Sequence, residues 1–245
     1  MTNTFTRLTL IVAALLSAQT LAWNDDMALQ DTKQLTLDAQ SLTTLNVEAR
    51  SGFLNIVGSD TAAITVKAEI YQYAAHDNYC LSLKQRAKSA ELIANSCDNY
   101  DKNTTRIDLT VSIPRTFKLN INDGSGAIEI ENTADTTIHD GSGKIVVNMI
   151  SGSLTIEDGS GSIDAKNIKG NVEIHDGSGS IDLVKSTGDV SIHDGSGNID
   201  VEDTSGSVTI TDGSGGIYVN KAKSFTLLAD GSGRVKVKNV ENTKL

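Results

Sequence analysis

Seven aspartates at regular intervals are the residues of this sequence best suited to binding a cation. Each of them opens the tetrapeptide Asp-Gly-Ser-Gly, with a first interval of 17 residues followed by five intervals of 18. When repeats of constant length stack, residues of the same phase lie above one another, so these carboxylates should form a column with a spacing of about 5 Å. The column contains Asp123, Asp140, Asp158, Asp176, Asp194, Asp212 and Asp230.

Neighbouring carboxylates at that spacing repel each other by roughly 1 kcal/mol when solvated, and two arrangements would offset the repulsion. In an Asx-turn, each aspartate accepts N–H bonds from the Ser and Gly two and three residues further on. Alternatively, Ca²⁺ binds between coils, because it prefers hard oxygen ligands. Calcium-binding rolls of nonapeptide repeats place Asp where this chain has Ile128, Ile163 and Ile181. We therefore favour the Asx-turn, keep calcium as the alternative, and expect no other cofactor.

Histidines form a second column at the position before the motif. His175 and His193 are one interval apart, and His139 has the same phase, with Glu157 and Thr211 at two other positions. Two imidazoles on adjacent coils can share a transition metal. The simpler interpretation is a surface column in which each imidazole bonds to a nearby Asp or hydroxyl.

Two further polar columns are predicted on the outward faces of strands. Three aspartates after the motif should form a solvated acidic stripe, or else a stripe that binds cations or a basic partner. Thr155, Ser191 and Thr209 form a column of hydroxyls, interrupted by Glu173 and ended by Leu227, that suggests ice or glycan binding. The acidic stripe consists of Asp164, Asp182 and Asp200, flanked by Glu129 and Tyr218.

Catalysis is not indicated by these patterns. Parallel β-helices include polysaccharide lyases and hydrolases, which need paired acids or a basic residue in a cleft. Here the acids fall in periodic columns, and no Ser, His and Asp have the irregular, single placement of a catalytic triad. A carbohydrate-active enzyme is the least favoured class, and it would require residues 69–105 to build a cleft.

The two cysteines, Cys80 and Cys97, lie in one short segment. In an oxidising compartment an even pair of this kind is most simply a disulfide. Closing so short a loop would contribute on the order of 3 kcal/mol. A metal or redox pair is the alternative, but the Cys-x-x-Cys spacing that would support it is not present.

The elements that must position these columns are short β-strands. Apolar and polar residues alternate over about five residues on both sides of each turn, as Ile163 and Ala165 or Val172 and Ile174 do. The pattern predicts an all-β, two-sheeted parallel β-solenoid of about 18 residues per coil, whose two strands pack their apolar faces together. An antiparallel meander is less favoured, because it would expose a long apolar face. One apolar column comprises Ile121, Ile138, Ile156, Ile174, Ile192, Ile210 and Leu228.

The first 22 residues have the pattern of a secretory signal peptide. Arg7 precedes the apolar stretch 8–16, and residues 20–22 (Thr-Leu-Ala) offer a cleavage site. The stretch is too short to span a bilayer, and no later stretch is long enough. No Cys lies near the cleavage site, which argues against a lipoprotein. We expect a location in the periplasm, or secretion to the cell surface.

The rest of the chain divides into two regions. Residues 23–118 are expected to form irregular N-terminal β coils that cap one end of the rod. Within them, residues 69–105 hold both cysteines, break the repeat, and are expected to be an inserted hairpin or loop that projects from the rod. Residues 119–245 are expected to form the regular solenoid.

In addition, the sequence resembles the bacterial envelope proteins called putative adhesins, a β-strand-repeat family of unknown function. The resemblance rests on residues 109–115 (Leu-Thr-Val-Ser-Ile-Pro-Arg), the Gly-Ser-Gly-x-Ile-x-Val coils, and the alternate turns. It covers about residue 45 to the C-terminus, and it implies a right-handed β-solenoid at the envelope. This chain departs from the family in its cysteine-containing insertion and in the Asp of every motif. The alternate turns end in Gly152, Gly170, Gly188 and Gly206.

These patterns predict a non-catalytic extracytoplasmic solenoid. As an adhesin or structural protein, it would present a repetitive surface to a protein or glycan at the cell envelope. The competing function is cation binding by the Asp or His columns. A formal charge of −10 repels nucleic acid and anionic lipid surfaces, so neither is expected as a partner.

Overall fold

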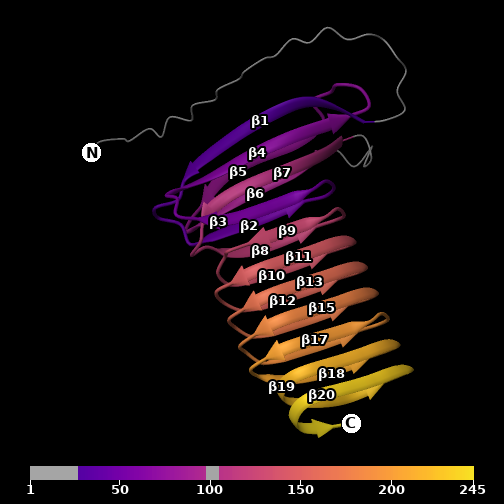
Figure 1. Ribbon diagram of the computed structural model, residues 1–245. Coiled ribbons are helices and arrows are strands. Elements are labelled where there is room, and N and C mark those ends of the chain that lie inside the picture. The colour runs from indigo at the N-terminus through magenta and orange to yellow at the C-terminus, as the bar shows by residue number, and fades with distance from the viewer. Residues whose placement is uncertain (1–26, 98–104) are drawn as a thin grey trace.

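The computed structural model describes residues 27–97 and 105–245, which consist of strands joined by turns and bends. Successive coils stack into a rod, with the N-terminal strands at one end and the C-terminal strand at the other (Figure 1). The all-β solenoid predicted from the 18-residue interval is therefore confirmed. Within the described residues, no helix is long and apolar enough to cross a membrane. The predicted signal peptide, residues 1–22, lies outside the described residues, as do residues 98–104 of the predicted insertion.

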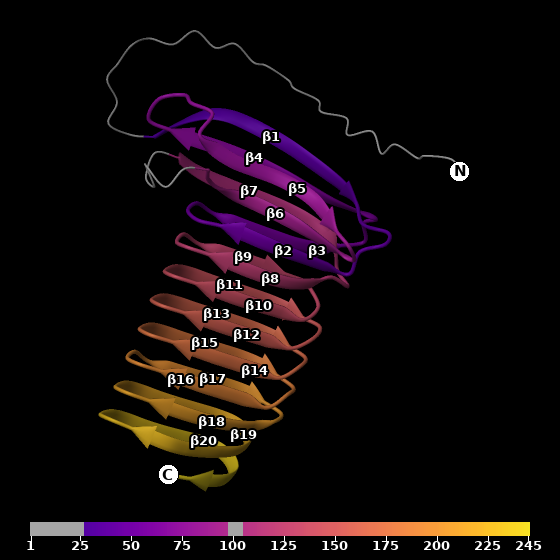
Figure 2. The same cartoon turned by 180° about the vertical axis from the view of Figure 1, so that it is seen from behind.

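Strands of successive coils pair in parallel and form two ladders that enclose the core (Figure 2). Ladder one consists, in spatial order, of β6 (Ser89–Ser96), β2 (Thr44–Ala49), β8 (Lys118–Asp123), β10 (Thr136–Asp140), β12 (Leu154–Asp158), β14 (Val172–Asp176), β16 (Val190–Asp194), β18 (Ser207–Asp212) and the second half of β19 (Gly215–Asp230). Ladder two consists of β7 (Thr105–Pro114), β3 (Leu54–Ser59), β9 (Ile128–Glu131), β11 (Gly143–Ile150), β13 (Gly161–Ile168), β15 (Gly179–Ser186), β17 (Ile199–Thr204) and the first half of β19. The last strand, β20 (Gly233–Lys244), pairs along β19 and ends both ladders.

The interior is filled by the aliphatic columns that the repeat predicts. Ile163 pairs with Ile181 in ladder two, and Ile174 pairs with Ile192 in ladder one, so like residues stack on like. All four are at most 1% exposed. Burying an Ile side chain contributes about 1.5–3 kcal/mol, which explains why the same residue recurs at the same phase.

The motif turn requires glycine at its fourth position. Gly161 has φ +145°, a conformation that residues with a side chain rarely adopt. A Cβ atom added there would lie 1.7 Å from the carbonyl oxygen of Gly143 in the neighbouring coil. Close stacking of turn on turn thus excludes any side chain.

A left-handed residue near the end of the ladder-two strands from β11 onward is a feature that the sequence pattern did not predict. Met149, Asn167 and Lys185 have φ between 57° and 62°. Such a conformation costs roughly 1–2 kcal/mol for residues with a Cβ, so the stacked neighbours must fix it. It turns the next side chain inward, and Ile150 and Ile168 are buried as a further core column.

The N-terminal coils do not follow one another in chain order. The coil of β2 and β3 lies between the coil of β6 and β7 and the coil of β8 and β9. Antiparallel strands close this end of the rod. They are β4 (Ala63–Gln72) on β7, β1 (Ala28–Asp38) on β4, and β5 (Tyr79–Arg86) on β6. The boundary at residue 118 between cap and regular solenoid stays a prediction.

The predicted inserted hairpin is the antiparallel pair β5 and β6, joined by a turn at Ala87 and Lys88. It does not project from the rod, so that part of the expectation is wrong. The strand β6 pairs with β2 over six residues, and its inward residues Ala90 and Leu92 are fully buried. The physical reason is the alternation of apolar and polar residues in β6, which matches that of the coils.

Cys80 and Cys97 form the predicted disulfide, with their Cα atoms 5.0 Å apart. The bond joins the start of β5 to the residue that follows β6. It therefore closes the hairpin at its open end and supports the cap.

Leu227, rather than the predicted Leu228, continues the apolar column of ladder one. Ile210 pairs with Leu227, whereas Leu228 is 65% exposed. The turn into the ladder-one half of β19 is one residue shorter than the corresponding turns of the preceding coils. Val208 therefore pairs with Phe225, which follows it by 17 residues and not by 18. A bulge at Leu228 then restores the 18-residue register at the motif.

Candidate functional site

Six of the seven motif aspartates point into the rod and not into solvent. Their exposed fractions are only 3–7%, so the estimate of repulsion between solvated carboxylates does not apply. Each lies two residues after a buried Ile or Leu of the same strand, and alternate residues of a strand share a face. Asp230 is exposed, and the pairing of β20 with β19 stops at Thr226, four residues before it. The buried members, here called the inner column, are Asp123, Asp140, Asp158, Asp176, Asp194 and Asp212.

The predicted Asx-turn is present, with one difference. Oδ1 of Asp158 and of Asp176 accepts the N–H of the Ser two residues on at 3.2 Å, and Asp194 and Asp212 do the same at 3.1 Å. The Gly three residues on does not contribute. Its N–H donates to the Ser carbonyl of the next coil, as from Gly161 at 2.9 Å.

The second carboxylate oxygen of each inner aspartate has no hydrogen-bond partner. Oδ2 is inaccessible and unbonded in all six residues, and in Asp140 the same holds for Oδ1. Buried polar atoms in folded proteins nearly always have a partner. A stack of unpartnered, ionisable oxygens is therefore the most unusual chemical feature of the described residues.

Burial raises the pKa of every carboxyl in the inner column. The pKa of Asp123 rises to about 7, first through loss of hydration and then through the charge of Asp140. The pKa of Asp194 rises to about 6, through burial and then through the charges of Asp176 and Asp212. Backbone N–H bonds act in the opposite direction but are outweighed. Burial is also the largest cause of the raised pKa of Asp140, Asp158, Asp176 and Asp212.

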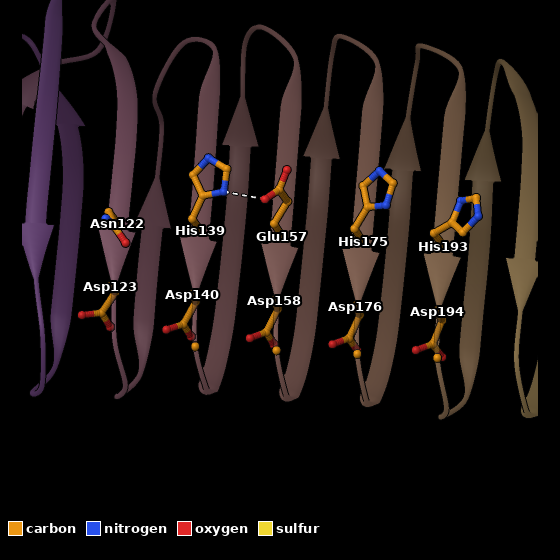
Figure 3. Close-up of a pocket in the computed structure, with 14 residues that line it drawn as sticks. Asn122, Asp123, His139, Asp140, Glu157, Asp158, His175, Asp176, His193 and Asp194 are labelled. Carbon is orange, nitrogen blue, oxygen red and sulfur yellow. Dashed lines mark hydrogen bonds and ion pairs between the residues drawn. The ribbon is translucent and has the colours of Figure 1, made fainter.

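An open groove of about 880 Å³ runs along the inner column (Figure 3). The aspartates form one wall, and the side chains at the preceding position form a parallel row beside them. None of the described residues that line the groove is Lys or Arg. The parallel row contains Asn122, His139, Glu157, His175 and His193.

The predicted His column lies on the outward face next to the groove. His175 and His193 stack, with ring centroids 5.4 Å apart and planes 14° from parallel. Nδ1 of His139 is 2.8 Å from Glu157, and Nε2 of His175 is 3.2 Å from Glu173. No group of three or more His, Cys, Asp or Glu in residues 27–97 and 105–245 is placed to hold a metal ion. Transition-metal binding by His175 and His193 stays a prediction.

The acidic stripe Asp164, Asp182 and Asp200 lies in register on the outward face of ladder two, half-buried at its first two members and exposed at the third. Asp164 pairs with Lys144 at 2.7 Å. The pKa of Asp200 is raised, first by partial burial and then by the charge of Asp182. This stripe is here called the outer column. Its carboxylates contact solvent, whereas those of the inner column are buried.

The hydroxyl column lies in register on the outward face of ladder one. Thr155, Glu173, Ser191 and Thr209 follow one another as predicted. The column does not end at Leu227. Because of the one-residue shift described above, Thr209 pairs with Thr226.

The inner position of the motif aspartates is the point that sequence reasoning missed, although the signal was present. Ile156 and Asp158 are two residues apart in one strand, so a buried Ile implies an inward Asp. The same parity holds for Ile174 and Asp176. The Asp-Gly dipeptide suggested an exposed turn, and the strand in fact continues to include the Asp.

Comparisons with known proteins identify the family. The model of the Toastrack DUF4097 family matches residues 42–244. A putative adhesin from Bacteroides fragilis is 14% identical over 87% of this chain and 97% of its own, with a TM-score of 0.48. A putative lipid binding protein from Parabacteroides distasonis is also 14% identical, over 88% and 97%, with a TM-score of 0.46. No curated protein matches.

Proposed function

We propose that this chain, which belongs to the Toastrack DUF4097 family, is a non-catalytic rod outside the cytoplasm. In this proposal, it presents regular columns of polar side chains to a protein or glycan at the cell envelope. The rod acts as an adhesive or structural element, and its stiffness keeps the columns in register.

The observation that carries the proposal is the pair of parallel columns on the outward face of ladder one. The positions of the hydroxyl column and the His column lie two residues apart on the same strands, and both stay in register from β12 to β18. Glu173 interrupts the hydroxyls, and Glu157 and Thr211 flank the stacked pair His175 and His193. Equivalent groups recur every 4.8 Å or so along the rod. A partner with its own repeat could contact several coils at once, and such multivalency strengthens weak single contacts.

Repetition also argues for binding over catalysis. The ionisable side chains of the solenoid recur coil by coil, as His175 and His193 or Asp164 and Asp182 do. A catalytic centre needs one irregular constellation with distinct roles for its members. Polar groups at the same positions of successive coils suit a surface that is contacted along its length.

A location outside the cytoplasm is supported by the Cys80–Cys97 disulfide, because such bonds form and persist in oxidising compartments. The signal-peptide pattern of residues 1–22 agrees with this location. Periplasm and cell surface are both compatible with the proposal. Thiol trapping in intact cells should leave both cysteines unmodified until a reductant is added.

Cosedimentation with insoluble peptidoglycan and with protease-treated envelope fragments tests the function. The double variant Thr155→Lys with Thr209→Lys disrupts the hydroxyl column, and we expect it to weaken binding by about tenfold or more, as loss of roughly 1.4 kcal/mol does. Val146→Lys with Val184→Lys makes the same charge change on ladder two and serves as the matched control. Binding lost only after protease treatment would identify a protein partner, and binding that persists would identify a glycan.

Two results would count against the proposal. Equal binding by wild type and both double variants would show that the ladder-one surface does not contact the partner. Release of reducing sugars from the polysaccharide by purified protein would favour a carbohydrate-active enzyme.

A further inference from the structure

The inner column consists of buried carboxylates whose charge no side chain of the described residues neutralises. Six carboxylates are stacked at successive coils, each at least nine-tenths buried. Only one oxygen of Asp158, Asp176, Asp194 and Asp212 accepts a backbone N–H, and Oδ2 is unpartnered throughout. Buried charges are normally paired or bound to a metal, because their desolvation is costly.

No basic side chain of the described residues neutralises these oxygens. The residues that line the groove beside the column include Asn122, Glu157 and three histidines, but no Lys or Arg. His139 and His175 are engaged with Glu157 and Glu173 on the outward face. A neutralising charge, either a proton or a cation, must therefore come from the solvent, and the groove lies along the column.

The register of the ladder fixes where such a charge would lie. Neighbouring coils pair Asp158 with Asp176, and Asp176 with Asp194, without any shift. Equivalent oxygens of successive coils are thus about 4.8 Å apart, the spacing of paired strands. A point midway between two of them is about 2.4 Å from each, which lies within the Ca²⁺–oxygen range of about 2.3–2.6 Å.

We propose that the inner column is a ladder of cation sites, in which a hard divalent cation such as Ca²⁺ binds between the Oδ2 atoms of successive aspartates. The site is independent of the surface function proposed above, because it lies on the inward face of ladder one. All-oxygen ligands select Ca²⁺ over transition metals, which prefer imidazole or thiolate.

The number of protein ligands also determines the affinity that we expect for the ion. No third acidic or His side chain converges on any point of the column within the described residues. Each ion would have two carboxylates from the protein, and water in the groove would complete its coordination. Such sites bind weakly, with dissociation constants of about 0.1–1 mM or above. Protons compete for the same oxygens, and the raised pKa values of Asp123 and Asp194 agree with that competition.

Thermal unfolding of the purified protein at about pH 8, first with EDTA and then with about 5 mM Ca²⁺ at constant ionic strength, tests the proposal. Binding to the native state should raise Tm by about 3–6 °C. The triple variant Asp158→Asn, Asp176→Asn and Asp194→Asn keeps an oxygen for each Ser N–H but removes three charges. We expect its response to Ca²⁺ to fall by at least about half, since most sites lose a ligand.

The outer column provides the matched control. The triple variant Asp164→Asn, Asp182→Asn and Asp200→Asn removes the same number of charges in the same coils, and it should keep the full Ca²⁺ response. Equal loss of response in both triple variants would mean general charge screening and would overturn the proposal. The absence of any Ca²⁺ shift in wild type at this pH would do the same.

Equilibrium dialysis with radioactive Ca²⁺ keeps the proposal testable if the inner triple variant does not fold. The single substitution Asp176→Asn removes a ligand from two adjacent sites and should lower the number of ions bound per chain. Asp182→Asn should leave that number unchanged. Unchanged binding in Asp176→Asn would contradict the assignment of the ions to the inner column.

Discussion

The inner and outer columns place the same residue type in the same coils under opposite conditions. Asp176 and Asp182 lie six residues apart, and each stacks on an aspartate of the coil before it. Asp176 is 6% exposed, with one oxygen bonded to Ser178 and one without a partner. Asp182 lies on the outward face of ladder two, half-buried beside solvent. The difference comes only from the side of the strand on which each residue falls.

This contrast shows what a carboxylate needs in order to be tolerated inside a thin core. The inner aspartates lie at the end of a strand, where the chain turns and the Ser N–H two residues on points back at them. That bond offsets part of the desolvation cost, and a cation or proton must offset the rest. The outer aspartates need neither, because water solvates them.

The largest loss of stability is expected when an inward carboxylate is placed away from the turn. Ile174 is fully buried and precedes Asp176 by two residues on the same face. Ile174→Asp would bury a charge with no turn N–H nearby and should cost about 4 kcal/mol or more. We expect failure to fold, or a fall in Tm of more than about 10 °C in a thermal melt.

Glu173→Asp is the control, since it introduces the same residue one position earlier on the outward face. It should change the free energy of unfolding by less than about 0.5 kcal/mol. A folded Ile174→Asp protein with a nearly unchanged Tm would show that the turn bond is not what makes the inner column tolerable.

The dependence of stability on pH should also separate the two columns. A carboxyl whose pKa is raised by folding adds stability below its unfolded pKa and loses it as pH rises through the folded pKa. For Asp123, a rise from 3.8 to about 7 corresponds to roughly 4 kcal/mol. In EDTA, Tm should therefore fall between about pH 5 and pH 8, the reverse of acid denaturation.

His139, His175, His193 and Glu157 line the same groove as the inner column, so variants must isolate the contribution of the inner carboxyls. The inner triple Asn variant should lose part of the slope of Tm against pH, because Asp123, Asp140 and Asp212 keep their raised pKa values. The outer triple Asn variant should lose less, because only Asp200 has a raised pKa in that column. A stability that increases steadily up to pH 8 in wild type would contradict the raised pKa values. Measurements should stay above about pH 5, because Asp135, whose pKa is lowered, acts in the opposite direction in acid.

The smallest change in stability is expected when only the hydrogen bond between an inner aspartate and the backbone N–H of its turn is removed. At about pH 5 in EDTA, Asp176→Ala removes the acceptor of the Ser178 N–H and should lower the free energy of unfolding by about 1 kcal/mol. Asp182→Ala, on the outward face, should change it by less than about 0.5 kcal/mol. Urea denaturation of both variants measures the difference, and equal values would show that the turn bond contributes no net stability.

The fold was predictable because every coil of the repeat has the same alternation of apolar and polar residues and the same turns. Alternation around Ile163 and Ile174 predicted strands, and a constant interval predicted parallel stacking in register. Prediction failed where the interval changed. The shorter turn before Phe225 shifted Leu227 into the core column, and the alternation in β6 made the expected projecting loop part of ladder one.

The candidate site was predictable in its residues but not in its environment. The motif aspartates, the histidines and the outer aspartates all lie in the columns that their spacing predicted. Whether the Asp of an Asp-Gly turn faces in or out depends on whether the strand still continues at that residue, and this is decided by pairing with the neighbouring coil.

The sequence by itself determined the coil length, the strand pairs of each coil, the identity of the stacked columns and the cysteine pair. These follow from local chemistry: side-chain alternation, glycine-dependent turns and a repeat that aligns like with like. The tertiary structure alone decided that β2 and β3 lie between later coils, and that the cap is antiparallel. It also decided that Oδ2 of every inner aspartate is buried without a partner, because burial depends on the coils above and below and not on the residue itself.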